Sequence, residues 1–357
     1  MAFRQREYDE SLKYHQQSLD LYKQYGSTSD ACNQFELMGS VAFQAEKYLL
    51  ASKYYKSLAA LYEDDGNTSQ LATALLNLGG AERRQGNSKN ALLFFNQVLA
   101  NIHASESSLR VAALHENMGN TYQKVDDLES AEVSYTKALS HYKNLEATPK
   151  IANQLMNLGT LEKSRDNNSG AIELYQKSLL LYDEFDDENS KSNVLCNLGL
   201  AEHAEGHLQT AATYFQDALG IIRNSGNVQR EAEVLGSLAQ IAIQQDNQDL
   251  AINLYQDLIS IHKASTTAEG DSLASYLLGL IERLRDDAVQ AEHYFKQALE
   301  IHGTKKPSEF IATVLDNLGD IQTNNENWAI ATEYYEHALS ISLNNCATHQ
   351  HLIRISS

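Results

Sequence analysis

The chain has 357 residues, 43% of them hydrophobic, and carries a formal net charge of −19 from 47 acidic and 28 basic residues. This negative field opposes nonspecific attraction to nucleic-acid phosphates and to anionic lipid surfaces, so we expect neither nucleic acid nor a membrane as a partner. The N-terminus is too polar for a signal peptide, and no apolar run approaches the length of a membrane span.

The cysteines favour a reducing compartment. Cys32, Cys196 and Cys346 are scattered, with no CxxC motif and no cluster of histidine and cysteine. Isolated cysteines of this kind are typical of cytoplasmic proteins and predict no zinc site. We therefore expect a cytoplasmic location.

The first predicted element is a single helix over residues 1–25. Its sequence matches the second helix of a helix pair that recurs later in the chain, and its first-helix partner would have to precede residue 1. We expect this half repeat to leave the apolar stripe of Leu12, Leu19 and Leu21 exposed, because nothing covers it in sequence order. The segment is then expected to fray or to be covered by another chain.

Residues 26–343 contain a pattern that returns every forty residues, eight times. Its first marker is a glycine, with an alanine in one copy, at Gly39, Gly79, Gly119, Gly159, Gly199, Ala239, Gly279 and Gly319. Twelve residues later stands an alanine, from Ala51 to Ala331, and four residues after that an aromatic, from Tyr55 to Tyr335. Self-similarity at a fixed period of this length is typical of a solenoid.

Each copy predicts two antiparallel helices, which in the second copy run over about residues 69–85 and 88–103, because apolar residues recur at helical spacing. The turns between them are polar dipeptides: Gly86-Asn87, Asp126-Asp127, Asp166-Asn167, Gly206-His207, Asp246-Asn247, Asp286-Asp287 and Glu326-Asn327. Aspartate or asparagine here can accept the free N–H groups of the next helix. Pro149 and Pro307 fall at first-helix starts, where proline loses no hydrogen bond.

The repeated small and aromatic residues have a packing role. Glycine and alanine let helix backbones approach closely where two helices cross, and the aromatic side chain is expected to fill the space toward the next repeat. A glycine inside a helix costs up to about 1 kcal/mol relative to alanine. Its recurrence therefore needs a structural cause.

A glycine, an alanine twelve residues on and an aromatic four further on, carried on a pair of helices, resemble the tetratricopeptide repeat. The forty-residue spacing is similar to a long-helix subgroup found in Pins/LGN-type polarity adaptors, kinesin light chains, bacterial peptide-pheromone receptors and sensor arrays of larger signalling proteins. The resemblance implies an all-α, right-handed solenoid of antiparallel helix pairs. It comprises a half repeat over residues 1–25, eight whole repeats over residues 26–343 in one array, and a C-terminal tail over residues 344–357 with no obvious capping helix.

Enzyme signatures are absent from the sequence. It contains no GxxxxGK[ST], HExxH or GxSxG motif, and its twelve histidines lack the spacing of metal ligands. We therefore expect no catalytic residue, no metal and no cofactor.

One polar residue recurs on the first helices. An asparagine two positions before the glycine occurs at Asn77, Asn117, Asn157, Asn197 and Asn317. In similar repeat proteins this position faces the concave groove, and an asparagine amide offers both a donor and an acceptor to the backbone of an extended peptide. The alternative is that these side chains bond within the fold and fix the spacing of neighbouring helices.

Basic and polar residues accompany these asparagines. Asn120 and Lys124 follow Asn117 at helical steps, Arg84 lies beyond Asn77, and Arg83 and Lys163 are expected to flank the groove. A positive strip inside an acidic protein favours a ligand that carries carboxylates or phosphate.

These features predict a non-enzymatic adaptor that binds an extended peptide or partner segment in the concave groove. Two alternatives remain open: a ligand-sensing array belonging to a larger signalling protein, and a bacterial peptide-pheromone receptor. The oligomeric state and the identity of the partner do not follow from the sequence.

Overall fold

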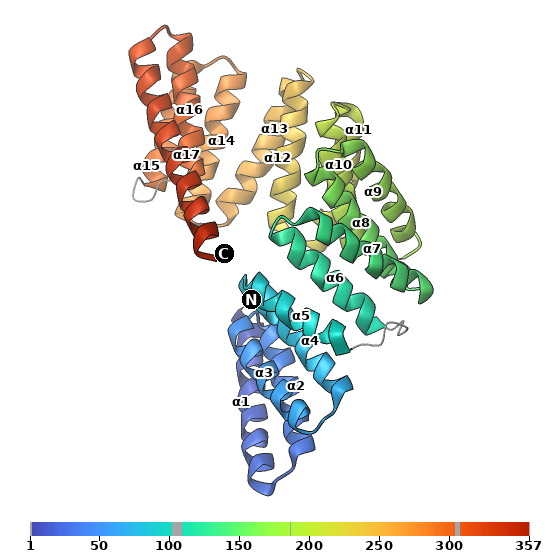
Figure 1. Ribbon diagram of the computed structural model, residues 1–357. Helices are drawn as coiled ribbons and strands as arrows, with labels where there is room; N and C mark the ends of the chain where they lie inside the picture. Colours follow the sequence, from blue (N-terminus) through green and yellow to red (C-terminus); the bar gives the residue numbers. More distant parts are fainter. Residues whose placement is uncertain (1, 102–108, 186, 304–307, 357) are drawn as a thin grey trace. The chain divides into compact units, whose positions relative to one another are not determined.

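Figure 1 shows the computed structural model, which describes the backbone of residues 2–101, 109–185, 187–303 and 308–356. Side chains are described within residues 7–22, 24–100, 109–185, 187–303 and 308–343. Every regular element in these ranges is an α-helix. Pro149 occupies the first turn of its helix, as predicted, and Pro307 lies outside the described residues.

The chain divides into two compact units, Met1–Asp187 and Glu188–Ser357. The first unit contains α1 (Ala2–Tyr25), α2 (Thr28–Gln44), α3 (Tyr48–Asp64), α4 (Thr68–Gln85), α5 (Ser88–Asn101), α6 (Leu109–Lys124), α7 (Leu128–Asn144), α8 (Thr148–Ser164) and α9 (Asn168–Tyr182). The second contains α10 (Glu188–Ala204), α11 (Leu208–Ser225), α12 (Val228–Gln244), α13 (Gln248–Ala264), α14 (Ala268–Leu284), α15 (Ala288–His302), α16 (Glu309–Asn324) and α17 (Trp328–Ser356). The sequence alone presents these helices as one uninterrupted array.

The helices follow the predicted pairing. Even-numbered helices from α2 onward are the first helices of the eight repeats, odd-numbered helices are the second helices, and α1 is the half repeat. Within each unit, consecutive helices pack against each other. The predicted all-α solenoid of helix pairs is confirmed.

The turns inside the repeats show why the polar dipeptides recur. The first residue of each has a positive φ, from 54° at Asp246 to 92° at Gly86, a conformation that ends a helix. The second residue often caps the next helix: Asp127, Asn167, Asn247 and Asp287 each accept a hydrogen bond from the backbone N–H three residues on, at 3.0 to 3.2 Å. The predicted capping is confirmed at these four turns.

The repeated glycine makes room for the repeated aromatic ring of its own repeat. A Cβ placed on Gly79 would lie 2.4 Å from Cε1 of Phe95, and the same overlap recurs at every repeated glycine, with closest distances of 2.4 to 2.9 Å. The rings also pack toward the next first helix, as predicted: Tyr135, for example, joins the buried cluster around Leu161. The ring is therefore packed from two sides.

The two ends of the array differ from the sequence-based expectation. Leu12 and Leu19 are buried, at 8% and 1% exposure, because α1 packs directly on α2 and adds both side chains to a core cluster that extends to α6. The predicted exposure of these two leucines is wrong, and only Leu21 is exposed. At the other end, α17 continues as a helix through the predicted tail to Ser356.

Candidate functional site

The asparagines form two groups, one in each unit. Asn77, Asn117 and Asn157 lie on α4, α6 and α8 of the first unit and are all half-buried. We call the face of these three helices that carries them the ladder face. Asn197 on α10 and Asn317 on α16 belong to the second unit.

Asn117 uses its amide within the protein. Its Nδ2 donates to the carbonyl oxygen of Ala113 at 2.9 Å, and its Oδ1 accepts from Nη2 of Arg83 at 3.5 Å. The arrangement recurs in the second unit, where Arg283 donates to Asn317 and Asn317 donates to its own helix at Thr313. For these two asparagines the geometry matches the structural alternative. The recurring 34-residue separation of arginine and asparagine is the sequence signal that could have identified the pairs.

Asn120 is also engaged within its repeat. The hydroxyl of Tyr135 lies 2.9 Å from Oδ1 of Asn120 and 2.9 Å from Oε1 of Gln123. The phenol donates to one oxygen at a time, and burial raises its pKa, which keeps it protonated. Asn120 thus helps to hold the core aromatic ring in place.

Asn77 and Asn157 differ from Asn117. Among the described residues neither side chain has a hydrogen-bond partner, although both are half-buried. Asn77 lines a cavity of about 190 Å³ together with residues of α2 and α3. These two amides keep a donor and an acceptor available to a peptide group.

The four basic residues of the predicted strip lie at the C-terminal ends of first helices: Arg83 and Arg84 on α4, Lys124 on α6 and Lys163 on α8. Helix C-termini favour cations, which gives the strip a structural contribution. The Lys124 ammonium, for instance, lies 3.9 Å from where a Cβ would stand on Gly86, beside the end of α4. All four residues therefore lie at the C-terminal ends of the helices that carry the asparagines.

Two of these cations are poorly compensated. Burial lowers the pKa of Lys163, and the described residues offer it no ion pair. Burial, followed by the charge of Arg84, lowers the pKa of Arg83, whose buried Nε has no hydrogen-bond partner among the described residues. An anionic group bound beside them would offset both effects.

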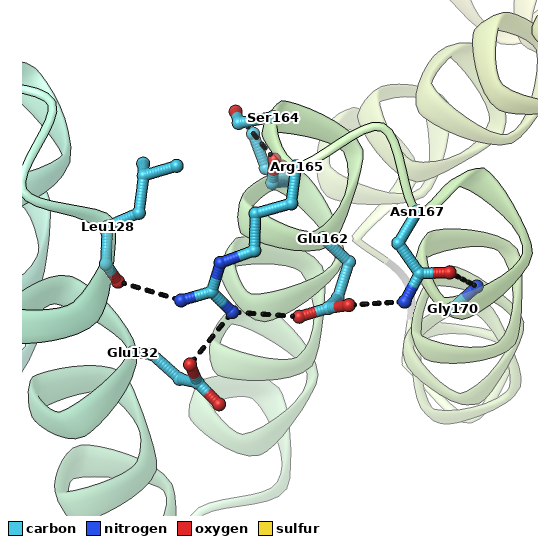
Figure 2. A network of polar contacts seen from close by, with 8 residues as sticks. Leu128, Glu132, Glu162, Ser164, Arg165, Asn167 and Gly170 are labelled. Atoms are coloured by element: carbon cyan, nitrogen blue, oxygen red, sulfur yellow. Dashed lines mark hydrogen bonds and ion pairs between the residues drawn. The ribbon is translucent and has the colours of Figure 1, made fainter.

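Arg165 fixes the helix that carries Lys163. Figure 2 shows its guanidinium between α7 and α8, where Nη1 lies 2.8 Å from Glu132 and 3.1 Å from Glu162, and Nη2 donates to the carbonyl of Leu128 at 3.4 Å. Glu162 also accepts from Asn167, the cap of α9. Arg165 joins α7 to α8, and Glu162 extends the network to the cap of α9. Nothing in the repeat pattern marks Arg165 in advance.

The described residues lack the features of two other kinds of site. In the described ranges, no helix is long and apolar enough to cross a membrane. No group of three or more histidine, cysteine, aspartate or glutamate side chains in those ranges is arranged to hold a metal ion.

Solved structures share the arrangement of the helices. The quorum sensor NprR from B. thuringiensis, in its apo form, matches with a TM-score of 0.64 and 16% identity over 96% of this chain and 98% of its own. Aspartyl phosphate phosphatase F from Bacillus subtilis matches with a TM-score of 0.60 and 15% identity, over 93% of this chain and 94% of its own. A signal transduction ATPase from Pyrococcus horikoshii with a tetratricopeptide repeat sensor matches with a TM-score of 0.64 and 14% identity, over 99% of this chain and 55% of the ATPase. At these identities the likeness shows the fold.

The comparison with curated protein sequences gives no significant match. Sequence models of the tetratricopeptide repeat match residues 30–102, 150–224, 190–264 and 271–344, and a second such model matches residues 112–143. These segments cover most of the eight helix pairs and have the glycine, alanine and aromatic register in common. The chain belongs to the tetratricopeptide repeat family.

Proposed function

We propose that this tetratricopeptide repeat scaffold is a non-enzymatic adaptor that holds an extended segment of a peptide or protein partner on the ladder face of the first unit. The observation that carries the proposal is the pair of half-buried amides of Asn77 and Asn157, which have no partner among the described residues. A half-buried amide that makes no hydrogen bond within the fold keeps its donor and its acceptor available to a ligand backbone. Asn117, between them, accepts a hydrogen bond from Arg83 instead.

The test uses a display library of random twelve-residue peptides and the full chain. Peptides selected on the wild type should lose roughly thirty-fold in affinity for the Asn77→Ala/Asn157→Ala variant, since each lost amide costs about 1 kcal/mol. The matched control is Asn317→Ala, which removes an asparagine of the second unit that is engaged within its own helix. Undiminished binding by the double variant, with unchanged helicity, would rule out the ladder face as the site.

The partner segment is further proposed to carry a carboxylate or phosphate that lies near Lys163. The support is the lowered pKa of this half-buried lysine and the absence of an ion pair to it within the described ranges. A Lys163→Gln substitution should weaken binding of the selected peptides and reduce its dependence on salt, because one attraction between opposite charges is lost. An unchanged salt dependence would contradict the acidic segment while leaving the amide contacts intact.

A cytoplasmic location fits this role. Cys32 and Cys196 are free thiols in the structure, which is the usual state of cysteine in a reducing compartment. Burial raises the pKa of both thiols, so neither is poised for reaction.

A sensor array is the second candidate. Two of the similar structures are described as a quorum sensor and as a signalling ATPase with a tetratricopeptide repeat sensor. A sensor would change its dimensions when it binds a peptide, whereas an adaptor need not. Small-angle scattering with and without a selected peptide distinguishes the two, because compaction on binding favours the sensor.

A further inference from the structure

Within each compact unit, a notch recurs beside the first helix of the next repeat in some of the described repeats. Two side chains form it: the residue three positions before the repeated glycine, and a residue near the end of the second helix. In the third whole repeat these are Glu116 on α6 and Tyr142 on α7. A third residue stands opposite, nine positions before the repeated glycine of the next repeat. For the third repeat this residue is Lys150 on α8.

In three repeats a side chain of the protein itself occupies this position, and in two of them its chemistry matches the lining. Nζ of Lys150 lies 3.6 Å from Oε2 of Glu116 and 6.0 Å from the centre of the Tyr142 ring. The Tyr142 hydroxyl also donates a hydrogen bond to Glu116. In the second unit the ring of Phe310 packs 5.6 Å from Tyr276 and 4.9 Å from His302. Arg230 likewise approaches Sγ of Cys196 at 3.7 Å. A notch lined by a carboxylate and a tyrosine thus binds the cation of Lys150, and a notch lined by aromatic rings binds the ring of Phe310.

The notch of the first whole repeat has the same lining but no such occupant. Glu36 and Tyr62 stand where Glu116 and Tyr142 stand eighty residues later, and Gln70 replaces Lys150. The Oε1 atom of Gln70 accepts from Nδ2 of Asn67 at 3.0 Å, and no hydrogen bond joins Gln70 to Glu36 or Tyr62 among the described residues. What remains is the cavity of about 190 Å³, whose walls besides Gln70 are Glu36, Leu58, Tyr62, Thr73, Ala74 and Asn77. Glu36 has no ion pair among the described residues.

We propose that this notch binds a lysine or arginine side chain of the ligand, in the way that its counterpart binds Lys150. The proposal rests on the proposed function, since Asn77 of the ladder face forms one wall. The aliphatic stem would pack on Leu58 and Ala74, and the cation would meet the Glu36 carboxylate and the face of the Tyr62 ring. The side-chain oxygens of Thr73 and Asn77 supply further acceptors.

The charge of the surroundings agrees with this choice. Burial raises the pKa of the Tyr62 hydroxyl, and the nearby Cys32 and Glu36 raise it further, so the ring stays neutral beside the carboxylate. The overall charge of −19 also attracts a cationic group. The notch lies two repeats from Lys163. At about 10 Å per repeat and about 3.3 Å per residue of extended peptide, the ligand would place its basic residue roughly six residues from its acidic one.

The first experiment titrates the full chain with N-acetyl-arginine methylamide and follows the Leu58 methyl and Tyr62 ring signals by NMR. N-acetyl-glutamine methylamide is the neutral match. The arginine compound should give saturable shifts that the glutamine compound lacks, and Glu36→Gln should weaken its binding about five-fold. Equal responses to the two compounds, no response at all, or an affinity that Glu36→Gln leaves unchanged would each overturn the proposal.

The repeat supplies its own matched variants. Gln70→Lys should place an internal cation on Glu36, as Lys150 lies on Glu116, and abolish the shifts at Tyr62. Lys150→Gln should open the counterpart notch and add a second set of shifts at Tyr142. Gln70 and Lys150 are both exposed, so both variants should fold, which thermal unfolding verifies. Full binding of the arginine compound by Gln70→Lys would contradict the assignment.

Peptide selection separates this inference from the function on which it rests. If selected peptides depend on Asn77 and Asn157 but are not enriched in lysine or arginine and tolerate Gln70→Lys, the adaptor function holds and the notch assignment fails. If no peptide is selected while the arginine compound still titrates against Glu36, the notch binds cations and the peptide function fails.

Discussion

Gly79 and Gly80 are neighbours on α4, yet a methyl group would meet different surroundings at each. At Gly79 it would overlap the Phe95 ring, 2.4 Å from Cε1, whereas at Gly80 nothing lies within 4 Å. We expect Gly80→Ala to stabilise the protein by up to about 1 kcal/mol, through helix propensity alone. Gly79→Ala should destabilise it by about 1 to 3 kcal/mol, because the ring must move. Urea unfolding measures both, and equal effects would show that the ring does not require the glycine.

His115 makes stability depend on pH. It is buried on α6 and its ring stacks on His141, with 5.8 Å between ring centres. Burial lowers its pKa from 6.5 to about 4, and the charges of Lys137 and His141 lower it further. The unfolded chain therefore takes up a proton near pH 6.5 that the folded chain resists until about pH 4. Stability is full above pH 6.5 and falls as the pH decreases through this interval, by on the order of 2 to 3 kcal/mol.

His115→Leu tests this dependence. Leucine occupies the same register at Leu75, Leu155, Leu195, Leu235 and Leu315, so the variant should pack well. Its free energy of unfolding should fall less steeply than that of the wild type between pH 6.5 and 4. Parallel pH profiles would show that His115 is not the group that titrates.

Among the elements, α8 is held on α7 by Arg165. Its guanidinium reaches Glu132, Glu162 and the Leu128 carbonyl and remains partly exposed. Because of this exposure, Arg165→Met should cost about 1 kcal/mol rather than the larger value of a buried network. The control is Arg285→Met at the same register of α14, where Ile252 stands in place of Glu132 and Glu282 is the arginine's one ion-pair partner among the described residues. A loss as large at Arg285 would mean that the bond to Glu132 contributes nothing.

At the scale of the whole molecule, the two compact units predict unfolding in more than one step. Trp328 is the single tryptophan and lies in the second unit, so its fluorescence reports that unit, whereas circular dichroism reports all helices. Gly79→Ala should shift part of the helical signal and leave the tryptophan transition in place. Gly279→Ala, which meets the Phe295 ring at 2.5 Å, should shift the tryptophan transition. Coincident transitions in both variants would indicate one cooperative array.

Much of the fold was predictable because it is set by interactions that recur at short range. Helical periodicity, capping by Asp127 and Asn167, and the close pairing of Gly79 with Phe95 all involve residues within a single helix pair or its turn. Each copy repeats the same local solution, so one register determines eight helix pairs. The burial of α1 was not predictable in this way, because Leu12 and Leu19 are buried by the contact of α1 with α2, which belongs to the following repeat.

The candidate site follows a different rule. The sequence by itself determined the register of the asparagines, the basic strip and the equivalence of Glu36 with Glu116. Only the tertiary structure decided that Asn117 is bonded to Arg83 while Asn77 is not. It also decided that Lys150 pairs with Glu116 in one notch, while Gln70 bonds to Asn67 and a cavity remains in another. The physical reason is that a hydrogen bond or ion pair between repeats depends on side-chain rotamers and on separations of a few ångströms, which differ between copies with the same spacing.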